Sequence, residues 1–219
     1  MTNPPKEPAL EDRAPDGEKL FSPSAARNRD PIREAFLKTM PHQGRILEIG
    51  AGTGEHAVHM ARALPDVSWH VSDPDEKSRR SIAAWMADSA LANLFGPYEI
   101  DVIRSRWGVE SLAPFSGMVS LNMIHIAPFA AAEGLFAGAG RLLGDEGQLF
   151  LYGPFSRNGA HIAESNERFD ASLKARDPRW GVRDLDLDIV PLAQKNSLRL
   201  EAIVEMPANN LAVIFVKTP

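Results

Sequence analysis

The chain has 219 residues, a length that suits one domain with a buried core. Its 24 lysines and arginines against 29 aspartates and glutamates give a net charge of −5, which excludes a global electrostatic attraction to nucleic acid. There is no cysteine, which excludes disulfides, cysteine-ligated metals and a thiolate nucleophile. Because the sequence also shows no signal peptide and no apolar run long enough to span a membrane, we predict a cytoplasmic globular protein.

The N-terminal twenty residues are rich in proline and charge and have little to bury. Residues 1–20 are therefore predicted to form a flexible arm, and residues 21–219 a single domain. A first helix is predicted over residues 31–39, because Asp30 can cap it and Pro31 suits the first helical position.

From residue 45 onward, short apolar runs alternate with helix-like stretches near residues 55–64, 75–90 and 129–142. This alternation predicts an α/β fold with a doubly wound, mostly parallel sheet and a C-terminal antiparallel hairpin. Segment 154–183, with a predicted helix over 162–174, is longer than most connections, so we expect a lid or a substrate-binding insertion. The predicted strands cover residues 45–49, 68–72, 98–102, 118–122, 148–152, 199–205 and 211–216.

Three glycines at alternate positions, Gly50, Gly52 and Gly54, follow the strand that ends at Ile49. Such glycines let the backbone bend sharply and let a ligand approach closely, as in nucleotide-binding loops. A dinucleotide-binding loop would have glycine or alanine at the next position, whereas this chain has Glu55, whose carboxylate would repel a pyrophosphate. A nicotinamide-dependent oxidoreductase is therefore the weaker hypothesis.

An acidic residue, Asp73, ends the second predicted strand, 19 residues after Gly54. This spacing suits a carboxylate that binds ribose hydroxyls, although Asp73 could instead cap the helix that follows Pro74. Asp101 ends the third predicted strand. Because the carboxyl ends of parallel strands share one edge of a sheet, the loop and both acids should meet there.

The pattern of Glu48, Gly50, Gly52 and Gly54 resembles motif I of class I S-adenosylmethionine (SAM) methyltransferases. The resemblance implies that SAM is bound by this loop, which includes Ala51, together with Asp73. It also implies that Asp101 lies near the adenine amino group and that Asn122 faces the methyl donor. A tight strand-to-helix turn without a ligand is the alternative for the loop, and a solvated turn residue is the alternative for Asp101.

Longer segments are similar to a small family of class I methyltransferases that includes methyltransferase-like protein 26, over residues 22–217: SPSAARNRDPI, LEIGAGTGEHAVHMARALP, NMIHIAPF, LFLYGPF and EMPANNL. The resemblance implies a seven-stranded fold. It also suggests that Arg27 and Asn28, in a segment covering the cofactor, bind the SAM carboxylate or a substrate, and that Asn209 and Asn210 line the substrate pocket. Surface solubility and simple turn chemistry are the respective alternatives.

Three polar residues at strand ends are candidates for catalysis. His125 could act as a general base or bind the substrate, Asn122 could face an amine, and Tyr152 could touch the substrate. A loop histidine bonded to the backbone is the alternative for His125. His56 and His59 lie three residues apart without a third ligand, so we predict no metal site, with His56 packing near the cofactor loop.

Together these features predict a SAM-dependent methyltransferase that transfers a methyl group in line to a small-molecule acceptor. The predicted binding partner is thus a small-molecule substrate, because the sequence contains no pattern typical of nucleic-acid binding or of membrane association. A non-catalytic SAM-binding module is the alternative, ahead of the nicotinamide-dependent oxidoreductase. The sequence does not predict the acceptor atom or the oligomeric state.

Overall fold

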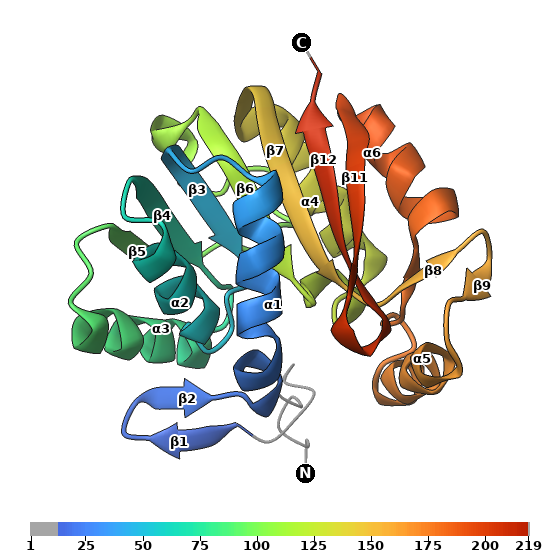
Figure 1. Ribbon diagram of the computed structural model, residues 1–219, viewed down its shortest axis with the longest axis horizontal. Helices are drawn as coiled ribbons and strands as arrows, with labels where there is room; N and C mark the ends of the chain where they lie inside the picture. Colours follow the sequence, from blue (N-terminus) through green and yellow to red (C-terminus); the bar gives the residue numbers. More distant parts are fainter. Residues whose placement is uncertain (1–12, 219) are drawn as a thin grey trace.

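A seven-stranded sheet lies at the centre of the computed structural model, which describes residues 13–218 (Figure 1). The strand order is β11-β12-β7-β6-β3-β4-β5. Strands β3 to β7 run parallel, and β12 runs antiparallel to both β7 and β11, which confirms the predicted fold class and the closing hairpin. The strands are β3 (Gly44–Ile49), β4 (Val67–Ser72), β5 (Leu94–Tyr98), β6 (Phe115–Leu121), β7 (Leu143–Gly153), β11 (Leu198–Met206) and β12 (Asn210–Lys217).

Helices cover both faces of the sheet, because successive side chains of each strand point to opposite sides. Ile46 of β3 belongs to a core cluster with α1, α2 and α3, whereas the adjacent Leu47 belongs to the cluster with α4 and α6. Among residues 13–218, no helix is long and apolar enough to cross a membrane. The helices are α1 (Pro23–Thr39), α2 (Glu55–Ala63), α3 (Glu76–Ser89), α4 (Phe129–Leu142), α5 (Glu164–Arg176) and α6 (Val190–Lys195).

The prediction of a third strand at residues 98–102 is wrong. The third strand in chain order within the sheet is β5, which ends at Tyr98. Its register pairs Tyr98 with Ser72 of β4. Ile100 and Val102 are buried, with 1% and 7% of their surfaces exposed, but they pack into the core from a loop. Their apolar alternation thus indicated burial and not strand pairing.

The first helix is longer than predicted, because α1 begins at Pro23 and contains Pro31 in its interior. Ser22 caps it, since the Ser22 side chain accepts a hydrogen bond from the backbone N–H of Ala25 at 3.1 Å. An internal proline costs one backbone hydrogen bond. The apolar face that includes Ile32 is buried against the sheet and offsets this cost.

The predicted flexible arm is corrected over residues 14–20, which take part in a hairpin of β1 (Ala14–Asp16) and β2 (Lys19–Phe21). The backbone N–H of Leu20 donates to the Ser81 hydroxyl at 2.8 Å, and the Trp85 indole N–H donates to the Leu20 carbonyl at 3.1 Å. The hairpin is therefore fastened to α3. The rest of the predicted arm, residues 1–12, lies outside the described residues.

Segment 154–183 contains β8 (Phe155–Arg157), β9 (Ala160–His161) and α5. With β10 (Arg183–Asp184) these strands form a separate three-stranded sheet in the order β10-β8-β9. We refer to residues 154–183 as the insertion. In Figure 1 its helix α5 lies beside the turn between β11 and β12.

Candidate functional site

The turn between β3 and α2 requires glycine on steric grounds. Gly50 and Gly54 have φ angles of 70° and 91°, in the left-handed region that side chains disfavour. A Cβ atom at Gly54 would lie 3.0 Å from the Ile82 Cα atom of α3, and one at Gly50 would lie 2.9 Å from the Met123 Cγ atom. The glycines therefore let the loop pack closely between α3 and the end of β6.

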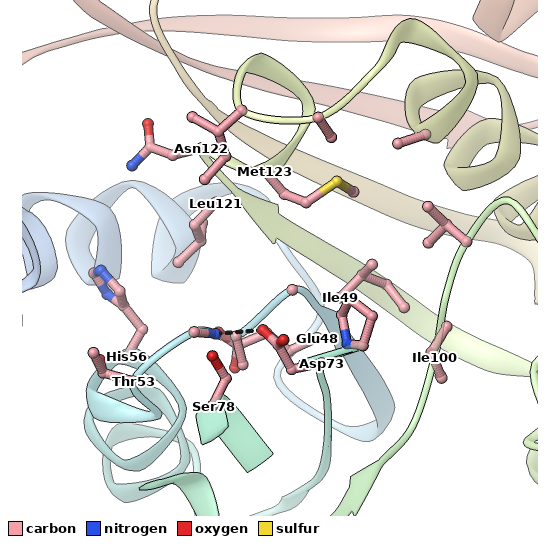
Figure 2. Close-up of a pocket in the computed structure, with 18 of the residues that line it drawn as sticks. Glu48, Ile49, Thr53, His56, Asp73, Ser78, Ile100, Leu121, Asn122 and Met123 are labelled. Carbon is pink, nitrogen blue, oxygen red and sulfur yellow. Dashed lines mark hydrogen bonds between the residues drawn. The ribbon is translucent and has the colours of Figure 1, made fainter. Parts of the chain in front are cut away.

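Asp73 follows β4 and is bonded to this loop. Its Oδ2 atom accepts the Gly52 backbone N–H at 2.9 Å (Figure 2), and its Oδ1 atom accepts the backbone N–H of Asp75 at 2.9 Å. Burial raises the pKa of Asp73, while these two N–H groups lower it. The cap of α3 is Asp75, whose side chain accepts the Ser78 backbone N–H at 2.7 Å. Asp73 thus braces the glycine loop, and the helix-cap role belongs to Asp75.

Glu48 lies behind the loop on β3 and is fully buried. Its carboxylate accepts the indole N–H of Trp69 at 2.7 Å. Burial, with a smaller contribution from the charge of Asp73, raises the pKa of Glu48 to about 7 against the lowering effect of the Trp69 hydrogen bond. Glu48 therefore changes its charge near neutral pH, directly below the loop.

A cavity of about 580 Å³ opens at the carboxyl edge of the sheet. In Figure 2, Ile100 lies on one side of the cavity and His56, in the first turn of α2, lies on the other. The lining also includes Ala131 of α4 and residues at the start of α1. Asp73 lies between these two sides. The predicted site residues that line the cavity are Asn28, Glu48, Gly50, Ala51, Gly52, Asp73, Asp101 and Asn122.

Six predicted site residues are not among those that line this cavity: Arg27, Gly54, His125, Tyr152, Asn209 and Asn210. The turn of Asn209 and Asn210 does reach the expected edge, because Leu211 pairs with Gly153 at the end of β7. There the Asn209 side chain donates to the Ser165 hydroxyl at 3.0 Å, and the Asn210 side chain donates to the Pro207 carbonyl at 3.0 Å. These asparagines stabilise the turn and join it to α5.

His125 has 1% of its surface exposed and packs against Phe155, with ring centroids 5.0 Å apart. Neither ring nitrogen has a hydrogen-bond partner among the described residues. Burial, together with the smaller effect of the Arg183 charge, lowers the pKa of His125 to about 3. A buried ring that resists protonation is poorly suited to take up a proton from an acceptor. This placement argues against the predicted role of His125 as a general base.

Tyr152 is also buried, with 4% of its surface exposed, and reaches the site only through another residue. Burial raises the pKa of its phenol, while a side-chain hydrogen bond with Asn28 lowers it. Because Asn28 lines the cavity, Tyr152 can orient this amide from behind.

Two contributions to the site were missed by sequence reasoning. The carboxylate of Glu55 accepts the backbone N–H of Ser22 at 2.7 Å and the hydroxyl of Thr53 at 2.9 Å, which fastens the start of α1 to the glycine loop. Arg13 lines the cavity, and its charge lowers the pKa of Asp73. Only the tertiary structure brings Ser22 and Arg13 to the loop, so no local pattern could have indicated them.

The insertion supplies a third wall, which includes Arg179 and Trp180. Arg183 fastens this wall to the segment after β6, because its guanidinium donates to the Ile124 carbonyl at 3.0 Å and to the Ala127 carbonyl at 2.7 Å. Within residues 13–218, no group of three or more histidine, cysteine, aspartate or glutamate side chains could hold a metal ion.

The chain matches a family model described as "Protein of unknown function (DUF938)" over residues 19–217. It is also similar to ribosomal RNA small subunit methyltransferase G of Ralstonia nicotianae, with 26% identity over 161 residues. That match covers 73% of this chain and 61% of the relative.

Solved structures with a similar fold include an O-methyltransferase family protein from Burkholderia thailandensis, with a TM-score of 0.70 and 11% identity, covering 88% of this chain and 60% of that one. Another is an O-methyltransferase family 2 protein from Planctomyces limnophilus in complex with apigenin, with a TM-score of 0.71 and 13% identity, covering 89% and 60%. The chain therefore spans about three-fifths of the length of these proteins. Together with the strand order, these similarities confirm the class I methyltransferase fold.

Proposed function

We propose that this chain, which belongs to the DUF938 family, is a SAM-dependent methyltransferase. The observation that carries the proposal is the contact of Asp73 with Gly52 at the cavity edge. It joins the candidate ribose-binding carboxylate to the loop that a nucleoside ligand would approach. We further propose the more specific kinship with the family of methyltransferase-like protein 26.

The residues around the cavity fit SAM better than a dinucleotide. A pyrophosphate would need free N–H groups and no negative charge at the start of α2. That position holds the buried carboxylate of Glu55, already bonded to Ser22 and Thr53. A cofactor without phosphate meets no such repulsion, whereas the Asp73 carboxylate can accept hydrogen bonds from ribose hydroxyls.

When bound, SAM supplies an electrophilic methyl group on a sulfonium centre. The chain positions the reactants and excludes water from them. Ile100 and Ala131 contribute apolar lining to the cavity, and Asn122 lies at the end of β6. Alignment of two reactants in such a site can contribute about 7 to 11 kcal/mol to lowering the barrier. Because His125 is buried away from the cavity lining, we propose that the reaction depends on the nucleophilicity of the acceptor and not on a histidine base.

We propose a small molecule as the acceptor. The insertion closes one side of the cavity with Arg179 and Trp180, and the net charge of −5 does not favour a polyanion. The similar protein from R. nicotianae is named for ribosomal RNA, so RNA is the acceptor class to test against. The cytoplasmic location stays a prediction.

The decisive experiment is calorimetric titration of the full chain with S-adenosylhomocysteine and, separately, with NADH. We expect S-adenosylhomocysteine to bind and NADH not to bind. Binding of NADH alone would replace the proposal with an oxidoreductase. Methyl transfer from isotopically labelled SAM is then measured with a library of small alcohols, phenols, amines and thiols, and with total RNA. Transfer only to RNA would overturn the small-molecule acceptor, and tight binding without any transfer would favour a non-catalytic SAM-binding module.

A further inference from the structure

The guanidinium group of Arg13 lies in front of the glycine loop. A Cβ atom at Gly52 would lie 3.2 Å from the Arg13 Nη2 atom, and apart from the chain neighbours of Gly52 no other described residue has an atom within 4 Å of that position. The Arg13 Nη1 atom also donates to the Ser78 hydroxyl at 3.4 Å. All three residues line the cavity. Arg13 therefore fills the space that the missing side chain of Gly52 leaves beside the loop.

The nucleoside of the proposed function requires the same space. A ribose bound at Asp73 must pass close to Gly52, because the Gly52 backbone N–H is bonded to the Asp73 carboxylate at 2.9 Å. The Arg13 charge already acts on this carboxylate, since it lowers the pKa of Asp73. In Figure 2, Ser78, the hydroxyl partner of Arg13, lies next to Asp73. The Arg13 guanidinium and the ribose hydroxyls thus compete for one carboxylate and one space.

Arg13 belongs to the weakly held side of the N-terminal hairpin. It precedes β1, whose three residues are all exposed. Strand β2 is instead bound to α3, because the Leu20 N–H donates to the Ser81 hydroxyl at 2.8 Å and the Trp85 indole donates to the Leu20 carbonyl at 3.1 Å. In Figure 1 the hairpin lies outside the layers of the sheet, beside α3. Arg13 and β1 can therefore move away from the loop while β2 stays on α3.

We propose, on the basis of the proposed function, that Arg13 forms an autoinhibitory contact. The N-terminal hairpin holds the guanidinium in the ribose position, and a nucleoside binds only when Arg13 has moved away. The apparent affinity is then the intrinsic affinity multiplied by the fraction of molecules in which Arg13 has left the loop. The contact weakens binding without preventing it, because a hydrogen bond of 3.4 Å is long and costs little to break. It thus sets the cofactor concentration at which the site fills.

The test uses two ligands that share the ribose. S-adenosylhomocysteine and adenosine both contain the base and the ribose, and only S-adenosylhomocysteine has the amino-acid end. Dissociation constants for both are measured by calorimetry on the full chain. For Arg13→Ala we expect roughly threefold to tenfold tighter binding of both ligands, the size of one hydrogen bond, because the competing group is removed. An equal gain for both places the competition at the part that they share.

Two further variants separate the contact from a general effect of charge. Arg13→Gln has a shorter, uncharged side chain that keeps an amide donor, so it should give a smaller gain in the same direction. Arg62→Ala removes an exposed arginine in the last turn of α2 that is not among the residues lining the cavity. It should leave both affinities unchanged.

The displacement of Arg13 has a readout that does not depend on the affinity of the variants. Trypsin cleaves after arginine and lysine, and the bond between Arg13 and Ala14 becomes more accessible when Arg13 leaves the loop. Because proteolysis follows the population of the open form, saturating S-adenosylhomocysteine should accelerate this cleavage in wild type by the same roughly threefold to tenfold. Cleavage after Lys19 is the internal reference and should not accelerate, since Lys19 forms an ion pair with Asp88 of α3.

Each outcome decides the proposal. Unchanged or weaker binding of either nucleoside in Arg13→Ala would overturn the autoinhibitory contact, because removal of a competitor can only strengthen binding. An equal gain in Arg62→Ala, or no acceleration of cleavage after Arg13, would overturn it as well. In these cases the proposed function stands, provided that wild type binds S-adenosylhomocysteine. Wild-type protein that binds neither nucleoside would overturn the proposed function, and the autoinhibitory contact with it.

Discussion

The carboxylate of Asp73 and the backbone N–H of Gly52 are 2.9 Å apart, although 21 residues separate them in the sequence. The contact forms because β3 and β4 are adjacent parallel strands that end at the same edge of the sheet. The second oxygen of Asp73 holds the N–H of Asp75, the cap of α3. One side chain therefore fixes both the glycine loop and the start of the next helix.

Asp73→Ala should abolish measurable binding of S-adenosylhomocysteine. Loss of two charge-assisted hydrogen bonds of roughly 1.5 to 3 kcal/mol each corresponds to at least about a hundredfold loss of affinity. Calorimetry measures the effect, with Asp66→Ala as the control, since Asp66 is exposed in the turn before β4. Unchanged affinity in Asp73→Ala would refute the ribose-binding role.

Gly54→Ala should destabilise the whole protein. The substitution places a Cβ atom 3.0 Å from the backbone of Ile82 at a φ angle of 91°, so strain and overpacking should lower the free energy of unfolding by roughly 2 to 4 kcal/mol. Chemical denaturation measures this. Gly108→Ala is the matched control, because Gly108 has a φ angle of 76° but nothing within 4 Å of its added Cβ atom. A loss of similar size in both variants would show that close packing at Gly54 is unimportant.

His125 should make the protein less stable in acid. Its pKa is lowered to about 3 in the folded state from 6.5, so the unfolded state binds more protons as the pH falls below 6.5. The free energy of unfolding therefore decreases with falling pH, by about 2 kcal/mol near pH 5 from this residue alone.

The effect of His125 can be isolated by measuring denaturation near pH 7.5 and near pH 5 for wild type and for His125→Asn. Glu48 acts in the opposite direction, since its pKa is raised to about 7, and His56 acts in the same direction as His125. Both groups are present in the two proteins, so the difference between their pH dependences belongs to His125. Equal pH dependence would contradict the prediction.

Arg183→Lys should loosen the segment after β6. The guanidinium donates to the carbonyls of Ile124 and Ala127 simultaneously, which the single ammonium of lysine cannot reproduce. We expect faster hydrogen exchange of the backbone amides at residues 122–128, by roughly tenfold or more, as for the loss of a charged hydrogen bond.

The control for this variant is Arg168→Lys, because Arg168 forms an exposed ion pair with Glu164 on α5. Hydrogen exchange is measured by mass spectrometry. In Arg168→Lys the exchange at residues 122–128 should be unchanged. In both Arg168→Lys and Arg183→Lys the exchange at the glycine loop should be unchanged. Unchanged exchange at residues 122–128 in Arg183→Lys would show that the insertion does not fix this segment.

Local patterns predicted the glycine loop correctly because its requirements are local. The residues of β3 alternate between two cores, and a positive φ angle permits little besides glycine. Strand pairing, in contrast, depends on residues that are distant in the sequence. Ile100 and Val102 have the alternation of a strand but belong to a buried loop, since burial alone does not specify which backbone groups pair.

Residue spacing places His125 and Tyr152 near strand ends, but it does not specify the direction in which each side chain points. Both are at or near strand ends at the expected edge, yet both are buried outside the cavity lining. A rotation of one side chain decides whether a strand-end residue faces a cavity or the core. Such rotations depend on neighbours such as Phe155, which pack against the ring only after the chain has folded.

The amino-acid sequence alone determined the doubly wound sheet, the closing hairpin and the glycine loop, because hydrophobic periodicity and backbone sterics act over a few residues. Only the tertiary structure decided that Glu55 would bind Ser22, that Arg183 would fasten the insertion, and that Asn28 and His56 would line the same cavity. These contacts join residues distant in sequence. Their geometry follows from the packing of whole helices and strands, which no local pattern contains.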